Sequence, residues 1–263
     1  MTETPILTEL TDGLLTIRLN RPDSLNSLNR ALLEATNEAF ERAAKDEDVR
    51  AVMLTGTGRG FCAGADLTEA SASAGGGPYD MSDNLRQLYD PLVLAIARLE
   101  KPVLCAVNGI AAGAGANFAL ACDIVVASDK AYFLQAFARI GVVPDAGGTW
   151  FLPRQIGLAK AMGLMMLADK LSAEEAERLG LIWAVLPDDS FEEEARALGL
   201  RLAKGPTQVH GSIKAMLRES FGNTLETQLA LESRYQSLAS RSEDFREGVM
   251  AFLQKREANF KGK

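Results

Sequence analysis

Histidine and cysteine are both scarce in this chain of 263 residues, which contains one histidine and three cysteines. A metal site built from several histidines is therefore impossible. His210 would also have to serve any Ser-His-Asp triad, but it stands in KGPTQVHGSIK, far along the chain from every glycine-rich turn that could present a nucleophile. Cys62, Cys105 and Cys122 are widely spaced without a CxxC pair, which argues against zinc and disulfides and fits a reducing cytoplasm.

The chain has no excess of positive charge. Its 28 Lys and Arg stand against 35 Asp and Glu, a net charge of −7, which argues against a general nucleic-acid binder because such a protein needs a basic face for phosphates. Apolar residues make up 47% and charged residues 24%, as in ordinary globular proteins. A GxxxxGK[ST] motif is absent, and GTGRGF lacks the spacing of a dinucleotide-binding loop. We therefore expect neither a P-loop nor a dinucleotide site.

One uncharged stretch is long enough to cross a bilayer, but its composition is wrong for that role. Residues 102–122 carry no charge over 21 positions. Asn108, Asn117 and three glycines interrupt the stretch, and Ala, Gly and Cys dominate it. We expect a buried strand, a tight turn and a buried helix there. The opening MTETPILTEL has neither a basic nor an apolar signal region, so we expect no signal peptide.

Strand and helix patterns alternate through the first 160 residues. LLTIRLN, VRAVMLTG, PVLCAVNG, DIVVAS and AYFLQ are typical of strands. Apolar residues recur at helical spacing from Asn29 and again from Asn84 to Leu99, where Pro91 predicts a kink or a boundary. SASAGGGPYD (71–80) has the composition of a mobile surface loop. The alternation predicts an α/β fold with right-handed crossovers.

Beyond Leu158 the patterns predict helices to the end of the chain. LSAEEAERLG contains a capping box, Ser172 with Glu175, and a stop signal at Gly180. Further helical patterns cover 191–204, 207–218, 224–239 and 243–257. We expect an α/β core followed by a helical tail.

Two glycine-rich loops each follow a buried strand and open towards a helix. They are GFCAGAD (60–66) and NGIAAGAG (108–115). Strand-to-helix turns present free backbone N–H groups, and the helix dipole adds partial positive charge. Two such N–H groups aimed at one point form an oxyanion hole. For either loop alone, close packing of a helix on a sheet is the simpler explanation.

Asp145 is the only charged residue of GVVPDAGGTW (141–150). Pro-Asp-x-Gly is good turn chemistry, so Asp145 could be a turn residue and nothing more. A lone carboxylate in an apolar segment is otherwise unusual, because ordinary core contains no Asp. The local sequence leaves both interpretations open.

Five segments make the chain similar to the crotonase (enoyl-CoA hydratase/isomerase) superfamily over nearly its whole length. They are LNRPDSLNSL, GRGFCAGADL, KPVLCAVNGIAAGAGANFALACDIVVAS, GVVPDAGGTWFLPR and FREGVMAFLQKREANF. The resemblance implies a crotonase-type α/β fold, with a ββα superhelix in residues 1–195 and a C-terminal helical region in residues 196–263. It also implies a homotrimer or a dimer of trimers that binds acyl-CoA. The net charge and the composition lead us to expect neither nucleic acid nor a membrane as partner. The helical region would mediate the oligomer contacts and complete the CoA site.

The same resemblance assigns catalytic roles. By the family motif, the backbone N–H groups of Ala65 and Ala114 stabilise a thioester enolate. The two glutamates that position water in a hydratase would fall at Asn117 and Phe137, and neither residue is an acid, so simple hydration is not expected. Asp145 stands near the position of the proton-transfer acid of several isomerase branches, which implies that it moves the proton.

A useful base at neutral pH needs a pKa above the value of about 3.9 that aspartate has in solution. Burial would raise the pKa of Asp145 and suit a group that must both take and return a proton. The apolar residues expected to cover it are Phe137, Val142, Val143 and Trp150. Phe137 would also make the pocket drier and limit competing hydration.

CoA contacts follow from the resemblance as well. The residues assigned to CoA are Arg59, Ala63, Asp66, Leu67, Phe252 and Lys255. Arg59 is the candidate for the phosphates, the next three border the adenine, and the last two reach the CoA of a neighbouring subunit. Asp23 stands where some hydratases carry a CoA-binding lysine. For Arg59 and Lys255, plain solvated charge is the alternative.

Within the superfamily the chain resembles the isomerase branch that converts ring-1,2-epoxyphenylacetyl-CoA to oxepin-CoA by a β,γ to α,β double-bond shift. Δ3,Δ2-enoyl-CoA isomerases share the mechanism and are the alternative. Thioester hydrolysis, C–C bond cleavage and a non-enzymatic binding module are the other readings of this scaffold. One base and one oxyanion hole suffice for isomerisation, so we expect no metal and no cofactor beyond the CoA of the substrate.

Overall fold

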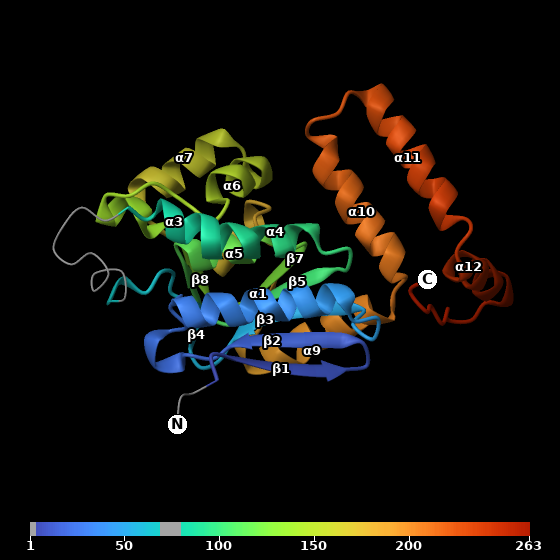
Figure 1. The fold of residues 1–263 in the computed structure, drawn as a ribbon, viewed down its shortest axis with the longest axis horizontal. Helices are drawn as coiled ribbons and strands as arrows, with labels where there is room; N and C mark the ends of the chain where they lie inside the picture. The colour runs from blue at the N-terminus through green and yellow to red at the C-terminus, as the bar shows by residue number, and fades with distance from the viewer. Residues whose placement is uncertain (1–3, 69–79) are drawn as a thin grey trace.

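The computed structural model describes residues 4–68 and 80–263 as two β-sheets wrapped by helices (Figure 1). Within these residues, the larger sheet has the strand order β1-β2-β3-β5-β7-β10 and the smaller has the order β4-β6-β8-β9. The strands are β1 (Ile6–Thr11), β2 (Leu14–Leu19), β3 (Ala51–Gly56), β4 (Gly60–Cys62), β5 (Val103–Val107), β6 (Ile110–Ala112), β7 (Ile124–Ser128), β8 (Tyr132–Leu134), β9 (Lys170–Ser172) and β10 (Ala184–Leu186). The helices are α1 (Arg30–Lys45), α3 (Ser82–Asn84), α4 (Asp90–Arg98), α5 (Ala114–Ala121), α6 (Gly148–Ile156), α7 (Leu158–Leu167), α8 (Ala173–Arg178), α9 (Phe191–Lys204), α10 (Thr207–Ser220), α11 (Leu225–Ala239) and α12 (Glu243–Gln254). Of the segment expected to be a mobile loop, only Asp80 belongs to the described residues.

A ββα repeat generates the two sheets. In the pairs β3/β4, β5/β6 and β7/β8 the first strand enters the larger sheet and the second enters the smaller one. Neighbouring strands of these repeats are parallel in both sheets. A helix follows each pair: α4 after the first, α5 after the second and α6 after the third. The predicted crotonase-type α/β superhelix is therefore confirmed.

The prediction that the chain is helical beyond Leu158 is wrong at two places. β9 pairs antiparallel with β8, and β10 pairs parallel with β7, so the two segments extend the edges of the two sheets. Each strand has only three residues, too few to show an alternating pattern. Their strand character comes from the neighbouring strand rather than from local sequence. Half of the predicted capping box forms: the Ser172 side chain accepts a hydrogen bond from the Glu175 N–H, whereas the Glu175 carboxylate pairs with Arg178.

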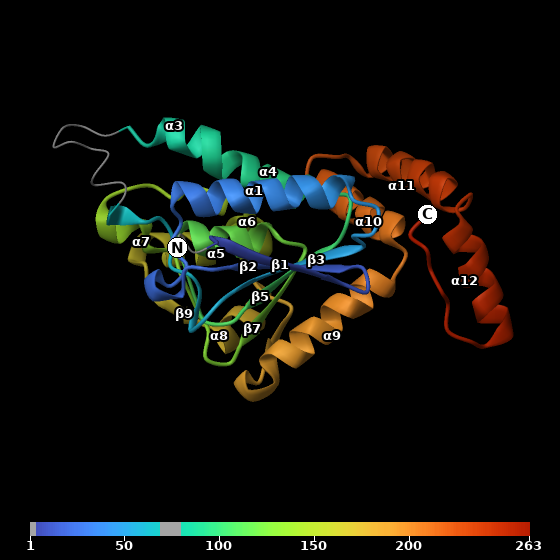
Figure 2. The ribbon, with the colours of Figure 1, turned by 60° about the horizontal axis from the view of Figure 1, so that its bottom comes forward.

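Helices cover both faces of the larger sheet, as Figure 2 shows with α1 on one side and α9 on the other. The apolar face predicted for α1 is buried, and the Asn29 side chain caps the helix by accepting from the Leu32 N–H at 2.9 Å. Alternate residues of β3 point to opposite faces: Val52 belongs to the main core, and Met53 packs in a second core with Phe191 of α9. A strand buried on both faces reads as a continuous apolar run, which explains VRAVMLTG.

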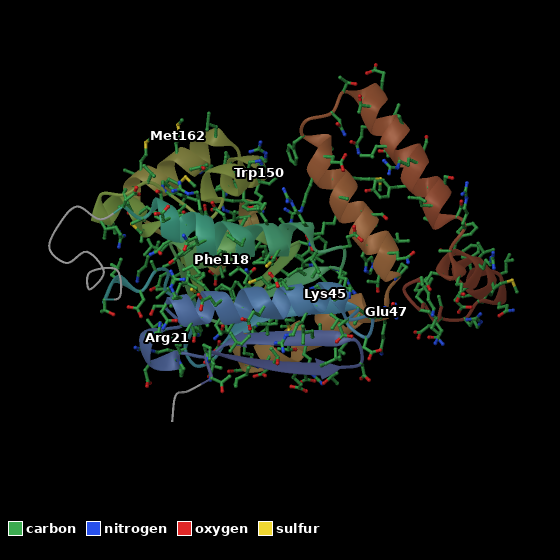
Figure 3. The ribbon with its side chains drawn as sticks, in the orientation of Figure 1. Arg21, Lys45, Glu47, Phe118, Trp150 and Met162 are labelled. Atoms are coloured by element: carbon green, nitrogen blue, oxygen red, sulfur yellow. The ribbon has the colours of Figure 1, made fainter. Side chains whose placement is uncertain are left out.

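The uncharged stretch 102–122 forms β5, β6 and α5, as expected for a buried strand, turn and helix. Every residue of α5 is buried, and Phe118 stacks on Tyr89 with ring centroids 6.0 Å apart. Figure 3 shows Phe118 beneath the helices that cover the sheet. Among the helices of residues 4–68 and 80–263, none is long and apolar enough to span a membrane.

The helical stretch before β5 changes type at the boundary that Pro91 predicts. α3 and α4 are joined by a π-helical turn over Leu85–Tyr89, in which the Asp90 N–H donates to the Leu85 carbonyl five residues back. Pro91 has no N–H and its ring crowds the carbonyl four residues before it, so the turn widens. This widened turn forms one wall of the site described below.

The last three helices extend from the body of the molecule (Figures 1 and 2). α10 is docked by ion pairs: the buried Lys214 ammonium lies 2.8 Å from an Asp123 carboxylate oxygen, and Arg218 bonds the other oxygen at 3.1 Å. α11 buries none of its residues. The predicted boundary between residues 195 and 196 falls inside α9, whose Ala195 and Ala203 both pack on the larger sheet.

Candidate active site

The two glycine-rich loops lie side by side, because they follow adjacent parallel strands. β4 pairs with β6, with Cys62 opposite Ala111, so both strands deliver their loops to the same edge of the smaller sheet. The contact is close: a Cβ added to Gly64 would lie 2.9 Å from the Ala112 carbonyl oxygen and 3.7 Å from the Gly113 Cα. The sequence could not establish this approach, since 48 residues separate Gly64 from Ala112.

Glycine is required just before each alanine that was assigned to the oxyanion hole. Gly64 has φ +92° and Gly113 has φ +51°, both in the region that other residues rarely adopt. In each turn, the N–H of the residue after the glycine is directed away from the hydrogen bonds between the strands. Within the described chain, neither the Ala65 N–H nor the Ala114 N–H donates to a protein acceptor. Ala114 is also the first residue of α5, where the helix dipole places partial positive charge.

Asp145 stands in a tight turn between Ile140 and α6. The turn is closed by the main chain, with the Gly148 N–H donating to the Asp145 carbonyl at 2.9 Å, and both central residues, Ala146 and Gly147, have positive φ. The carboxylate is not needed for that closure. Its Oδ1 atom is buried and has no hydrogen-bond partner among the described residues. The turn-only interpretation leaves this orphaned oxygen unexplained.

Burial raises the pKa of the Asp145 carboxyl from 3.8 to about 6; a hydrogen bond from its own backbone N–H opposes the shift, and the negative charge of Asp90 adds to it. The expected rise is therefore confirmed, but the expected cover is partly wrong. Phe137 is buried, whereas Val143 is 81% exposed and Trp150 is 40% exposed. Both side chains point outward because their turn and helix lie at the surface.

The Asp145 turn borders a pocket of about 620 Å³. One wall is the helical segment from Asp80 to Asp90, which includes the widened π turn, and the other is residues 142–149. The charged side chains that line it besides Asp145 are Asp80, Arg86 and Asp90. Asp90 carries no sequence motif, so nothing in the sequence indicated that it would approach Asp145.

A hydrogen bond ties the Asp145 turn to the first turn of α5. The Asn117 Nδ2 donates to the Asp145 carbonyl at 2.8 Å, and Asn117 lies in the first turn of α5, which begins at Ala114. The Asp145 turn is thus attached to the helix that begins at Ala114, although neither Ala65 nor Ala114 lines the Asp145 pocket. Neither hydratase-glutamate position holds an acid: Asn117 is fully buried, and the Phe137 ring lies 3.8 Å from where a Cβ on Gly113 would stand.

The residues assigned to the adenine side of CoA lie on the first glycine loop. Ala63 is half-buried and Leu67 is 52% exposed. Asp66 accepts hydrogen bonds from Thr68, Arg21 and Ser27, and the bonds from Thr68 and Arg21 hold the pKa of its carboxyl down at about 2. Arg21 stands at the edge of the molecule (Figure 3). Asp66 therefore organises this loop, whatever else it contacts.

The remaining residues assigned to CoA, Arg59, Phe252 and Lys255, lie in different parts of the molecule. Arg59 is exposed in the turn between β3 and β4, with no ion pair among the described residues. Phe252 and Lys255 lie at the end of α12, at the opposite end of the molecule from β4 (Figures 1 and 2), and Phe252 is 82% exposed. One chain does not bring these two residues to its own site. Their assignment to a neighbouring subunit's CoA stays a prediction.

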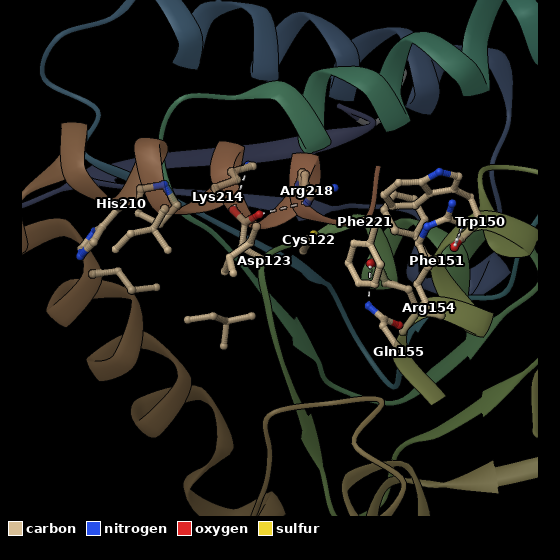
Figure 4. Close-up of a pocket in the computed structure, with 16 residues that line it drawn as sticks. Cys122, Asp123, Trp150, Phe151, Arg154, Gln155, His210, Lys214, Arg218 and Phe221 are labelled. Atoms are coloured by element: carbon tan, nitrogen blue, oxygen red, sulfur yellow. Dashed lines mark hydrogen bonds and ion pairs between the residues drawn. The ribbon is translucent and has the colours of Figure 1, made fainter. Parts of the chain in front are cut away.

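His210 lies in a second pocket, of about 380 Å³, between α10 and α6 (Figure 4). Asp123, Lys214 and Arg218 line that pocket, and the Arg154 guanidinium lies 4.2 Å from the Trp150 ring centroid. Burial and the charge of Arg50 lower the pKa of His210. Asp145 does not line this pocket, so no triad of His210 with Asp145 exists. Within the described ranges, no cluster of three or more His, Cys, Asp or Glu could hold a metal ion.

The chain is a ββα superhelix in which two glycine-rich loops meet and the Asp145 turn is bonded to α5. It belongs to the enoyl-CoA hydratase/isomerase family, whose model matches residues 9–263. The 1,2-epoxyphenylacetyl-CoA isomerase of Escherichia coli (strain K12) is 47% identical over 258 residues, 98% of each chain. A Rhodobacter capsulatus protein named "Probable enoyl-CoA hydratase" is 48% identical over 97% of each chain. A crystal structure of enoyl-CoA hydratase from Bacillus anthracis superposes with a TM-score of 0.90 at 31% identity, covering 98% of this chain and 100% of that one.

Proposed function

We propose that the protein is an acyl-CoA isomerase that moves a C=C bond from the β,γ to the α,β position through a thioester enolate. The observation that carries the proposal is the Asp145 carboxylate, whose buried Oδ1 has no partner among the described residues, whose pKa is about 6, and whose main-chain carbonyl is bonded to the first turn of α5. The proposed substrate is ring-1,2-epoxyphenylacetyl-CoA and the product oxepin-CoA. The 47% identity to the E. coli isomerase of that name supports this choice.

In the proposed mechanism the Ala65 and Ala114 N–H groups donate to the thioester oxygen. Asp145 takes a proton from the carbon next to the thioester, and the electron pair delocalises into the C–O bond to form the enolate. The same carboxyl then returns the proton to the γ carbon and restores the carbonyl. For the epoxide, opening to the oxepin is electrocyclic and needs no acid or base. A pKa near 6 leaves Asp145 mainly ionised at pH 7 yet able to give the proton back.

The proposal includes a CoA site and an assembly. Arg59 would contact the CoA phosphates, and Ala63, Asp66 and Leu67 would border the adenine. Phe252 and Lys255 would act from a neighbouring subunit in a homotrimer or dimer of trimers. The exposed apolar side chains of α11 and α12 support association, because a single chain leaves them in water. They are Leu225, Leu229, Leu238, Phe245, Val249 and Phe252. The three buried, unpaired cysteines fit a reducing cytoplasm.

Two related activities compete with this proposal. Δ3,Δ2 isomerisation of linear enoyl-CoA would use the same residues. Hydration is favoured by the name of the R. capsulatus relative, but it requires acids to position water, and Asn117 and Phe137 are not acids. The proposal therefore ranks isomerisation first.

Ultraviolet absorbance tests the proposal directly. A linear β,γ-unsaturated acyl-CoA should gain the absorbance of the conjugated thioester, and an α,β-unsaturated acyl-CoA should lose little of it by hydration. Ring-1,2-epoxyphenylacetyl-CoA should be used with a higher kcat/KM than the linear substrate. Rapid hydration without isomerisation would reject the proposal, and a preference for the linear substrate would move it to the Δ3,Δ2 reaction.

A further inference from the structure

The end of β8 contacts both halves of the site. The Leu134 carbonyl accepts from the Gly113 N–H at 2.8 Å, directly before the oxyanion residue Ala114. The next residue, Gln135, uses its side chain: its Nε2 donates to the Asn117 Oδ1 at 2.8 Å. Gln135 is 5% exposed and Asn117 is fully buried. One strand end therefore holds the oxyanion loop through its main chain and Asn117 through a side chain.

The hydrogen bonds from Gln135 to Asp145 can run in only one direction. The Asp145 carbonyl can only accept, so Asn117 must present its NH2 group to it. The Asn117 oxygen then faces Gln135, which must present its own NH2 group. The Gln135 Oε1 is left buried with no partner in the described parts of the chain. A buried acceptor left unpaired destabilises the fold. Here the unpaired acceptor is the Gln135 Oε1, at the end of the network away from Asp145.

The network has little room to shift. A Cβ added to Gly148 would lie 2.4 Å from the Asn117 Nδ2, so the first turn of α6 presses directly on the amide. Ala146, inside the same turn, is buried and has φ +45°, a strained conformation for alanine. Such a turn persists only where its surroundings hold it, and the Asn117 amide is one of the groups that do.

We propose that Gln135, acting through Asn117, is a positioning residue that sets the Asp145 carboxylate against the oxyanion hole of Ala65 and Ala114. This inference rests on the proposed isomerase function. Gln135 does not itself line the Asp145 pocket. Loss of its donor would free the Asn117 amide to rotate, and the Asp145 turn would lose a fixed partner. Displacement of a reacting group by about 1 Å costs up to about 10²-fold in rate.

A displaced turn would also admit water to the carboxylate. The charged groups that face Asp145 across the pocket are Asp80, Arg86 and Asp90, and the α5 and β8 residues of the network are neutral amides. Burial is the main cause of the raised pKa of Asp145. Hydration would therefore move that pKa from about 6 towards its ordinary value of 3.8. The acidic limb of the kcat profile would move to lower pH.

The test compares Gln135→Met, which keeps the side-chain length but removes the donor, with Thr36→Val. Thr36 is equally buried, and its hydroxyl donates to the Leu32 carbonyl within α1, which does not line the Asp145 pocket. Gln135→Met should lower kcat about 10- to 100-fold and change KM less than about threefold. Its acidic limb should fall by more than about half a pH unit. Thr36→Val should change none of these. If methionine prevents folding, Gln135→Glu offers the same shape without the donor when ionised.

A double-mutant cycle checks the route through Asn117. In an Asn117→Ala background, Gln135→Met should cause no further loss of kcat, because its effect has no other path. A kcat within about threefold of the parent, a loss carried by KM, an unmoved acidic limb or additive losses would each overturn the inference. Asp145→Asn separates this failure from failure of the proposed function: an active Asp145→Asn rejects the function, whereas an inactive one beside a normal Gln135→Met rejects only the inference.

Discussion

Replacing Asp145 by asparagine should abolish proton transfer while leaving the fold intact. The turn is closed through the Asp145 carbonyl, which accepts from the Gly148 N–H at 2.9 Å and from the Asn117 amide at 2.8 Å, and asparagine keeps that carbonyl. Removal of a general base costs about 10²–10⁴ in rate. We expect a loss within that range; Asp80 and Asp90, the other carboxylates that line the pocket, are the groups that could limit it.

Stability should change in the opposite direction to activity. An aspartate whose folded pKa is raised from 3.8 to about 6 destabilises the folded state by about 3 kcal/mol at pH 7, where it is ionised in both states. That penalty is absent below pH 3.8, grows between the two pKa values and is complete above about pH 6. Asparagine has no charge to bury but still loses hydration of its amide. Asp145→Asn should therefore gain about 1–2 kcal/mol at pH 7 and nothing near pH 3.

Three measurements test these expectations. The variant should fail to generate conjugated enoyl-CoA absorbance, and it should stop exchanging the α-protons of the substrate with deuterium oxide, because the enolate never forms. Urea unfolding at pH 7 and pH 3 gives the stability change.

Asp83→Asn is the matched control, since Asp83 flanks the same pocket without lining it. Undiminished exchange would mean that another base acts, and the sequence offers Glu69, which lies outside the described residues. Full activity with lower stability would return Asp145 to the role of a turn residue.

Three further predictions test the rest of the site. Ala114→Pro removes one oxyanion donor at a helix position that tolerates proline, and should lower kcat about 10²–10³-fold; a folded variant that loses less than about tenfold means the hole lies elsewhere. Asp90→Asn removes a negative charge that raises the pKa of Asp145, so the acidic limb of kcat should move to lower pH; an unmoved limb would show that this charge does not reach the base. Light scattering at micromolar concentration should give a trimer or a hexamer, and a monomer would rule out a CoA site shared through Lys255.

Much of the architecture could be predicted because it depends on local sequence patterns. Alternating apolar residues located β2, a continuous apolar run located β3 and period-3.6 spacing located α1, which the Asn29 side chain caps at its start. Gly64 and Gly113 marked the two loops, since only glycine adopts their backbone conformations easily. Such signals depend only on residues close in the sequence, so they can be recognised without knowledge of the fold.

Only the tertiary structure decided which distant groups meet. β9 and β10 are strands because β8 and β7 offer them hydrogen bonds, and three residues cannot express that preference alone. Asp145 stands out locally as the only charge in its segment, yet its orphaned Oδ1, the approach of Asp90 and the support from Gln135 through Asn117 all depend on side chains 10 to 55 residues away. Burial and hydrogen-bond partners are properties of three-dimensional neighbours, so the sequence could single out Asp145 but not the surroundings that raise its pKa.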